Sequence, residues 1–78
     1  MRYFFHLRES GTYVADEEGL DLPSLKAARL AATASARCVI AGDAMAGKVP
    51  LRAMIEVDDE TGARVLDLPF RDAVVIDG

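Results

Sequence analysis

One segment limits what this chain can fold into more than any other: residues 24–48, SLKAARLAATASARCVIAGDAMAGK. It holds nine alanines between positions 27 and 46, and alanine is the best helix former. Apolar residues recur within it at spacings of three and four, at Leu25, Ala28, Ala32, Ala36 and Val39. This pattern predicts a long helix with one apolar stripe. Because the stripe is mostly alanine, we expect the helix to lie close to its neighbour.

The segments on either side of this helix predict strands. Residues 2–8 and 12–16 are rich in aromatic and β-branched residues around a Ser-Gly turn, which is typical of a β-hairpin. Residues 53–59 and 63–70 alternate apolar and polar side chains around a second glycine-containing turn. Residues 17–24 contain glycine and proline and predict a loop.

These elements predict one small α+β domain over residues 1–78. Parallel strands need long crossovers, and one helix supplies a single crossover. We therefore expect a four-stranded antiparallel sheet with the connectivity β-β-α-β-β, the strand order 2-1-3-4, and the helix packed on one face. The alternative order places the third strand beside the second.

Alternation along the strands assigns side chains to the two faces of this sheet. The side chains expected under the helix are Tyr3, Phe5, Leu7, Ile55, Val57, Leu66, Leu68 and Phe70. The side chains expected on the opposite face are Phe4, His6, Met54, Glu56, Val65 and Asp67. The opposite face is therefore mixed in character rather than uniformly polar.

Charge and cysteine content narrow the classes of partner. Nine Lys and Arg residues and thirteen Asp and Glu residues give a net charge of −4, and the basic residues are scattered. Nucleic-acid binders usually carry a basic patch, so we expect no nucleic-acid partner. The sequence contains no run of about 20 apolar residues, so we expect no membrane span. The single Cys38 cannot form an internal disulfide, which favours a reducing, cytoplasmic location.

Residues 42–49, GDAMAGKV, reproduce the glycine–lysine spacing of a phosphate-binding P-loop. A P-loop, however, joins a strand to the start of a helix, where backbone N–H groups bind phosphate. Here the stretch ends the predicted helix, where the helix dipole is negative. Val49 replaces the hydroxyl that would bind Mg²⁺, and Pro50 prevents a following helix. We interpret the stretch as a helix C-terminus and expect no cofactor.

His6, the single histidine, is the main candidate for catalysis. In the predicted sheet Glu56 lies on the same face of the adjacent strand, which makes the two residues a candidate pair. Because no nucleophile or second base accompanies them, we interpret them as a cross-strand polar pair on a solvent-facing surface. Cys38 lies on the helix away from the alanine stripe, and we expect it to be a small buried apolar residue rather than a reactive thiol. The sequence thus predicts no catalytic residue.

Two acidic clusters are the candidates for a cation site. They are residues 16–18 with Asp21, and residues 58–60, and the predicted sheet places both at one end. Their spacing matches no Ca²⁺-binding loop. Asp and Glu are also ordinary residues of turns and helix starts. We therefore interpret both clusters as turn residues and expect no metal.

The segment 72–78, DAVVIDG, is unusually apolar for residues that follow the last predicted strand. One helix cannot cover both faces of a four-stranded sheet. We therefore expect a surface that takes a protein partner, and favour a homodimer over a tail that folds back on its own chain. The expected interaction surface comprises Phe4, His6, Met54, Glu56, Val65, Val74, Val75 and Ile76.

The stretches RYFFHLR, DEEGLDLP and IEVDDETGARVLDLPFRDAV resemble a family of small uncharacterised bacterial proteins, a domain of unknown function frequent in alphaproteobacteria. The resemblance covers nearly the whole chain and implies neither an activity nor functional residues. A weaker likeness is to HicB-type antitoxins. It rests on Gly11, Tyr13, Val14, Ala15, Asp21, Leu22 and Pro23. Residues 23–25, Pro-Ser-Leu, replace the Pro-Gly-Cys usual in those antitoxins, and no DNA-binding segment follows.

These observations favour a small cytoplasmic, non-enzymatic protein-interaction or accessory domain. The alternative is an antitoxin-like acidic inhibitor of a basic partner protein. A metal binder or an enzyme that uses His6 and Glu56 ranks third.

The interpretation of residues 42–49 predicts that ATP and GTP do not bind. Lys48 is expected to lie beside the last carbonyls of the helix rather than beside phosphate. Replacing it (Lys48→Ala) should therefore leave calorimetric titrations with either nucleotide flat, as for the parent chain. A micromolar isotherm that the substitution abolishes would contradict this interpretation.

Overall fold

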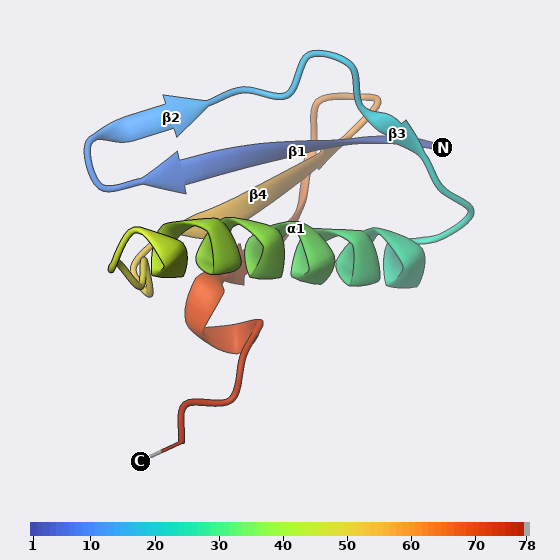
Figure 1. Cartoon of the computed structure of the whole chain (residues 1–78). Coiled ribbons are helices and arrows are strands. Elements are labelled where there is room, and N and C mark those ends of the chain that lie inside the picture. Colours follow the sequence, from blue (N-terminus) through green and yellow to red (C-terminus); the bar gives the residue numbers. More distant parts are fainter. Residues whose placement is uncertain (78) are drawn as a thin grey trace.

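Five strands, one α-helix and one short 3₁₀ helix form residues 1–77, the part of the chain that this computed structural model describes (Figure 1). They are β1 (Arg2–Glu9), β2 (Thr12–Val14), β3 (Leu20–Asp21), α1 (Leu25–Met45), β4 (Met54–Asp59), β5 (Arg64–Pro69) and η1 (Phe70–Asp72). The sheet is antiparallel, with the order β2-β1-β4-β5, and β3 also pairs with β1. The α+β class and the order of the four longer strands were predicted correctly.

The predicted number of strands was wrong, because the expected loop 17–24 contains β3. This strand pairs Asp21 with Arg2 and Leu20 with Tyr3, at the beginning of β1. Strand β2 pairs with the end of β1 and stops at Val14, short of the predicted boundary. The two short strands therefore share one edge of β1. A two-residue strand is too short for an alternating pattern to reveal it.

Helix α1 begins and ends as its sequence indicates. The Ser24 side chain caps its start, because Oγ accepts a hydrogen bond from Ala27 N–H at 3.1 Å. At its end, Gly47 N–H donates to the Ala44 carbonyl at 3.0 Å and Lys48 N–H donates to the Asp43 carbonyl at 2.9 Å. Gly47 has a φ of 85°. This combination is a Schellman motif. The stretch with P-loop spacing is thus a helix C-terminus, as predicted.

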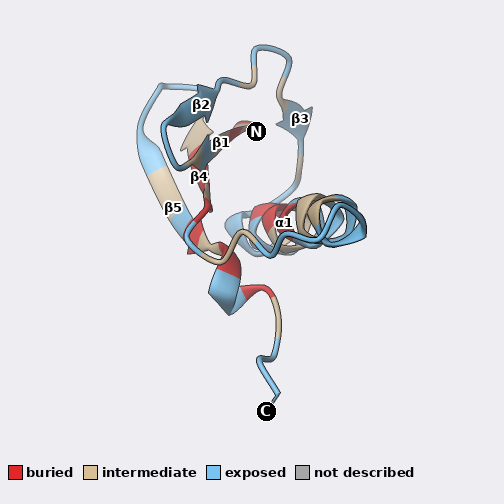
Figure 2. Cartoon of the chain, turned by 60° about the vertical axis from the view of Figure 1, so that its left-hand side comes forward, coloured by how far each residue is buried: buried red, intermediate tan, exposed pale blue. Residues whose placement is uncertain are grey.

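The core lies between α1 and one face of the sheet, and the opposite side of α1 is exposed (Figure 2). Ala28, Ala32 and Ala36 are each 0 % exposed, and so is Val57 on the central strand β4. The side chains predicted to lie under the helix all belong to this core or pack against it. Methyl side chains keep the helix axis close to the strands. The predicted alanine stripe is therefore the packing face, although Leu25 at its beginning is 49 % exposed.

The segment after β5 closes one end of the core. Phe70 and Ala73 are 0 % and 1 % exposed, and Arg37 Nε donates to the Ala73 carbonyl at 2.6 Å. Beyond Ala73 the chain runs away from the helix and the sheet (Figure 1). The fold-back alternative thus describes the segment up to Ala73, whereas Val75 and Ile76 remain exposed. Gly78, part of the predicted tail, lies outside the described residues.

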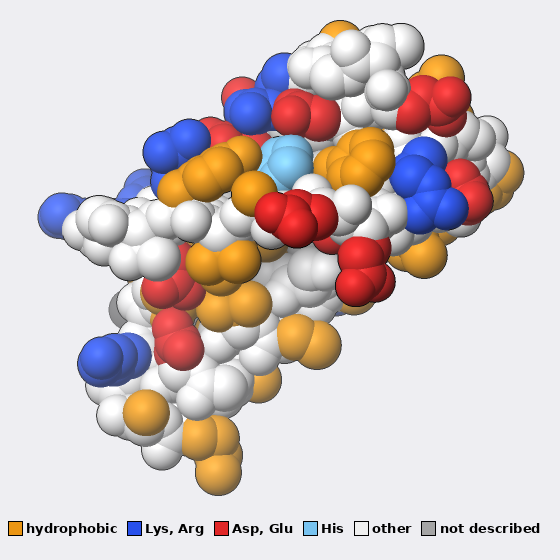
Figure 3. Space-filling view, turned by 90° about the horizontal axis from the view of Figure 1, so that it is seen from above, with side chains coloured by type: hydrophobic (Ala, Val, Ile, Leu, Met, Phe, Trp, Pro, Cys, Tyr) orange, Lys and Arg blue, Asp and Glu red, His pale blue; other side chains and the backbone are white. Residues whose placement is uncertain are grey.

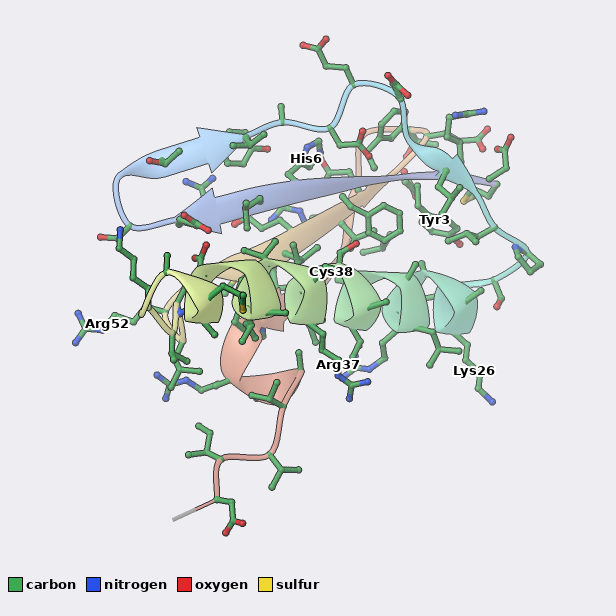
Figure 4. The ribbon with its side chains drawn as sticks, viewed as in Figure 1. Tyr3, His6, Lys26, Arg37, Cys38 and Arg52 are labelled. Atoms are coloured by element: carbon green, nitrogen blue, oxygen red, sulfur yellow. The ribbon has the colours of Figure 1, made fainter. Side chains whose placement is uncertain are left out.

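Two further findings concern α1. Cys38 is exposed, so its prediction as a buried residue was wrong, because it lies on the side of the helix opposite the alanine stripe (Figure 4). Within residues 1–77, no helix combines the length and the apolar character needed to cross a membrane.

Alanine substitutions at Gly19 and Gly11 form a matched pair that tests the close approach of the chain to β1 just before β3. Their φ angles are 73° and 75°, so an alanine at either position is strained, by about 1 kcal/mol. A Cβ at Gly19 would also lie 2.9 Å from Arg2 Cγ, Phe4 Cε1 and the Tyr3 carbonyl oxygen, whereas no such neighbour lies within 4 Å at Gly11. We expect Gly19→Ala to destabilise the fold by about 2 kcal/mol more than Gly11→Ala.

Urea unfolding monitored by circular dichroism measures this difference as a shift in midpoint at constant m value. Equal midpoints for the two variants would show that the close approach of Gly19 to β1 does not contribute to stability.

Candidate functional site

A network of charged side chains lies on the sheet face opposite α1. Its central members, His6 on β1 and Glu56 on β4, are directly opposite each other in the register, and each is only 8 % exposed. Figure 3 shows the histidine between hydrophobic side chains, with acidic and basic side chains around them. Buried ionisable groups need partners, so their contacts decide what this face can do.

Both nitrogens of His6 are hydrogen-bonded. Nδ1 accepts the backbone N–H of Asp16 at 3.0 Å. The neutral ring therefore carries its proton on Nε2, which lies 3.2 Å from Asp58 Oδ2 and donates to it. The Tyr13 ring lies beside the imidazole, with the ring centroids 5.8 Å apart. His6 is thus fixed in one tautomer by groups from the β2–β3 loop and from β4.

Glu56 is held by two arginines rather than by His6. Arg8 Nε donates to Glu56 Oε2 at 3.0 Å and Arg8 Nη2 donates to Oε1 at 3.3 Å, while Arg64 Nη2 lies 3.4 Å from Oε1. The hydrogen bond from Arg8, followed by the charges of both arginines, lowers the pKa of Glu56 against the opposing effect of burial. Arg8 also lies over the Tyr13 ring, 4.6 Å from its centroid.

Arg64 joins the two halves of the network. Its Nε donates to Asp58 Oδ1 at 2.6 Å and its Nη1 donates to Asp67 Oδ1 at 3.0 Å. The pairing of β4 with β5 shifts between Val57 and Asp58, so that Arg64 lies opposite Asp58. This β-bulge places Arg64 and Asp67, three residues apart, on the same face. The hydrogen bond that Arg64 donates to Asp58 is the main cause that raises the pKa of Arg64.

Asp16 completes the edge of the sheet between β2 and β3. Its Oδ2 accepts the N–H of Phe5 at 3.0 Å, and its Oδ1 accepts the N–H groups of Glu18 and Gly19 at 3.1 and 3.2 Å. Burial raises the pKa of Asp16, but these three backbone donors outweigh it and lower the pKa below its ordinary value. The carboxylate takes the place of a strand partner for Phe5.

In the second acidic cluster, Asp59 accepts the hydrogen bonds of the turn between β4 and β5. Asp59 Oδ1 accepts hydrogen bonds from the N–H groups of Thr61 and Ala63 at 2.8 and 3.2 Å and from Thr61 Oγ1 at 2.5 Å. Asp16 and Asp59 thus each accept hydrogen bonds within a turn, as interpreted. Asp21, however, lies in β3, and Asp58 lies in β4, where it binds His6 and Arg64. Within residues 1–77, no three His, Cys, Asp or Glu side chains are grouped so that they could hold a metal ion.

The structure corrects two predictions about this face. His6 and Glu56 oppose each other as predicted, but they bond to different partners and do not form a pair. The face is also less open than predicted, because His6 and Glu56 are buried and Phe4 and Met54 are half-buried. Val65, predicted on this face, packs against the core instead, because the β-bulge shifts its register. The predicted interaction surface also included three tail residues. Val74 is half-buried, whereas Val75 is 92 % exposed and Ile76 is 66 % exposed.

The network therefore holds the sheet together rather than presenting reactive groups. Every buried side-chain nitrogen and oxygen in the described residues has a hydrogen-bond partner. His6 has no free nitrogen with which to accept a proton from a substrate, and Glu56 is saturated by guanidinium groups. Within residues 1–77, no pocket lies beside them.

The most exposed apolar side of the domain is on α1, and sequence reasoning missed it. Leu30 is 66 % exposed and Met45 is 90 % exposed. We define the outer stripe of α1 as six residues with alternating spacings of four and three: Ala27, Ala31, Ala34, Cys38, Ala41 and Met45. This is the spacing of a helix–helix seam. The sequence signal for this stripe is its own set of small apolar residues at helical spacing, next to the first alanine stripe.

Asp16→Ala should reduce the free energy of unfolding by about 2 kcal/mol, because three backbone donors lose a charged acceptor. Because its pKa is lowered in the folded state, Asp16 stabilises the fold fully above about pH 5, and the contribution disappears as pH falls through the folded pKa, below 3.8. The difference between parent and variant should therefore shrink in acid.

Urea unfolding of parent and variant between pH 7 and pH 3 tests this. Glu17→Ala, at an exposed neighbouring carboxylate, is the matched control and should change stability by less than about 0.5 kcal/mol. A difference between parent and Asp16→Ala that is independent of pH would contradict the role of the carboxylate.

Comparison with known proteins adds a family and no activity. No curated protein and no solved structure matches the chain significantly. Residues 2–71, nearly the whole chain, match the family described as a domain of unknown function, DUF6894. The hairpins, the alanine-rich helix and the charged network all lie within the matched range. No function is evident from this match, and the chain belongs to the DUF6894 family.

Proposed function

We propose that this domain works through protein–protein contact, without enzymatic activity, and that it forms a homodimer. The observation that carries the proposal is the outer stripe of α1. A helix that is apolar on both sides is normally covered on both sides. Here one side packs on the sheet, while Ala34, Cys38, Ala41 and Met45 are exposed on the other.

The charge distribution on α1 supports a contact along this stripe. Lys26 and Arg37 lie along one flank of α1, and the outer stripe itself contains no charged residue. An exposed apolar surface bordered by charged residues is typical of a protein interface. We therefore propose the homodimer interface on α1 and not on the sheet face, where the charged network lies.

The contacts of the network support the absence of catalysis. A general base must reach the proton that it removes, whereas both nitrogens of His6 and both oxygens of Glu56 are already bonded within the protein. A reducing, cytoplasmic compartment is part of the proposal, and the exposed thiol of the single Cys38 supports it.

Light scattering at tens of micromolar tests the proposal. We expect the parent to have twice the mass of one chain. Ala34→Arg places a charge in the middle of the outer stripe and should yield a monomer with an unchanged helical circular dichroism spectrum. Ser10→Arg, which adds the same charge in the exposed β1–β2 turn, should remain dimeric. A monomeric parent would contradict the homodimer.

A further inference from the structure

The outer stripe of α1 and the segment after Ala73 are two exposed apolar surfaces of complementary shape and charge. We infer that residues 75–77 of one copy lie on the outer stripe of a second copy, and that residues 75–77 of the second copy lie on the outer stripe of the first. This inference rests on the proposed self-association. The occupant of the stripe is thus a second copy of this chain, joined by exchanged tails.

The shapes of the two surfaces fit. Most of the outer stripe is alanine, whose methyl side chains project little from α1. Val75 and Ile76 are bulky, β-branched and 92 % and 66 % exposed. Burying such side chains against small ones removes apolar surface from water on both partners. The stripe thus supplies small side chains, and the tail supplies large ones that can pack on them.

The charges at the borders of the two surfaces are opposite. The apolar tail residues lie between Asp72 and Asp77. Lys26 and Arg37 point from α1 toward the side on which the chain leaves η1 (Figure 4). A tail carrying Asp77 that crosses a neighbouring α1 therefore brings a carboxylate to a basic border.

The direction of the tail favours the second copy over its own helix. The hydrogen bond from Arg37 fixes Ala73 beside α1, and from there the chain leads away from the helix (Figures 1 and 2). Residues 74–77 span up to about 14 Å when extended. That is enough to cross a helix about 10 Å in diameter. A two-fold axis beside α1 lets both tails do so at once.

One face of α1 is too small to bury the area that a stable dimer needs, so the tails must contribute to the interface. A standard interface buries about 800 Å² on each partner, a substantial part of the 5190 Å² accessible surface of the described residues. One face of a 21-residue helix is about 31 Å long and about 10 Å wide, and so covers roughly 300 Å². A helix pair alone falls short, and two exchanged tails add apolar surface where it is lacking.

The open edge of the sheet is a poorer place for a second copy. Strand β5 lies at this edge, but it carries Arg64 and Asp67, ends in Pro69, and contains the β-bulge opposite β4. Charges, proline and bulges are the features that prevent edge strands from pairing.

Cysteine crosslinking tests the contact between copies. One chain keeps Cys38 in the outer stripe, and the other combines Cys38→Ala with Ile76→Cys and carries a mass tag. Mixed, re-equilibrated at tens of micromolar and treated with a short bismaleimide, they should give a tagged–untagged product. In the control, the tagged chain combines Cys38→Ala with Thr12→Cys. The crosslinked product should form at least tenfold faster with the Ile76→Cys chain than with this control. Equal rates for the two tagged chains would overturn the inference.

Deletion of residues 75–78 tests the energetic role of the tail. The deletion preserves the buried Ala73 and its contact with Arg37, so helical circular dichroism should be unchanged while light scattering shows a monomer. A deletion chain that stays dimeric overturns the tail exchange but leaves the proposed homodimer standing. A parent that is already monomeric removes both. In dilute Ile76→Cys with Cys38 retained, a crosslink within one chain would show that the tail covers its own helix.

Discussion

The close packing of α1 on the sheet is the contact on which the rest of the structure depends. Ala28, Ala32 and Ala36 have no exposed surface, and Val57 beneath them is equally buried. Methyl groups bring the helix near the strands, so that a core of few large side chains, Phe70 among them, fills the remaining space. The same alanine-rich composition also leaves small side chains on the outer side of α1, where Ala34 and Ala41 are exposed.

The opposite face of the sheet is completed by charge instead of by a second helical layer. Arg8 and Arg64 enclose Glu56, while Asp16 and Asp58 bind the two sides of His6. Ion pairs of this kind often add little net stability, because desolvation opposes attraction. Their bonding directions, however, connect β1, β4, β5 and the β2–β3 loop, so they favour one register. This explains how a sheet with one helix tolerates a second, partly apolar face.

The two faces therefore have different capacities for function. The network satisfies its own donors and acceptors and offers little to a ligand. The outer stripe and the residues after Ala73 are apolar, exposed and bordered by opposite charges. The family to which the chain belongs carries no assigned activity, so the proposed role in association rests on this surface and not on the family.

The sequence by itself determined the features that depend on local periodicity. Alternation placed Tyr3, Ile55 and Leu68 under the helix, and Ser24 and Gly47 marked the helix ends, because capping and side-chain direction are set by neighbouring residues. Only the tertiary structure decided the partners of the polar residues. His6 bonds to Asp58, 52 positions away, and to the backbone of Asp16, while a β-bulge turns Arg64 toward Glu56. Such contacts depend on register shifts and loop paths that leave no periodic trace in the sequence. The same reason explains why β3 was missed, and why Cys38 proved to be exposed: which side of an alanine-rich helix is covered is decided by what packs on it.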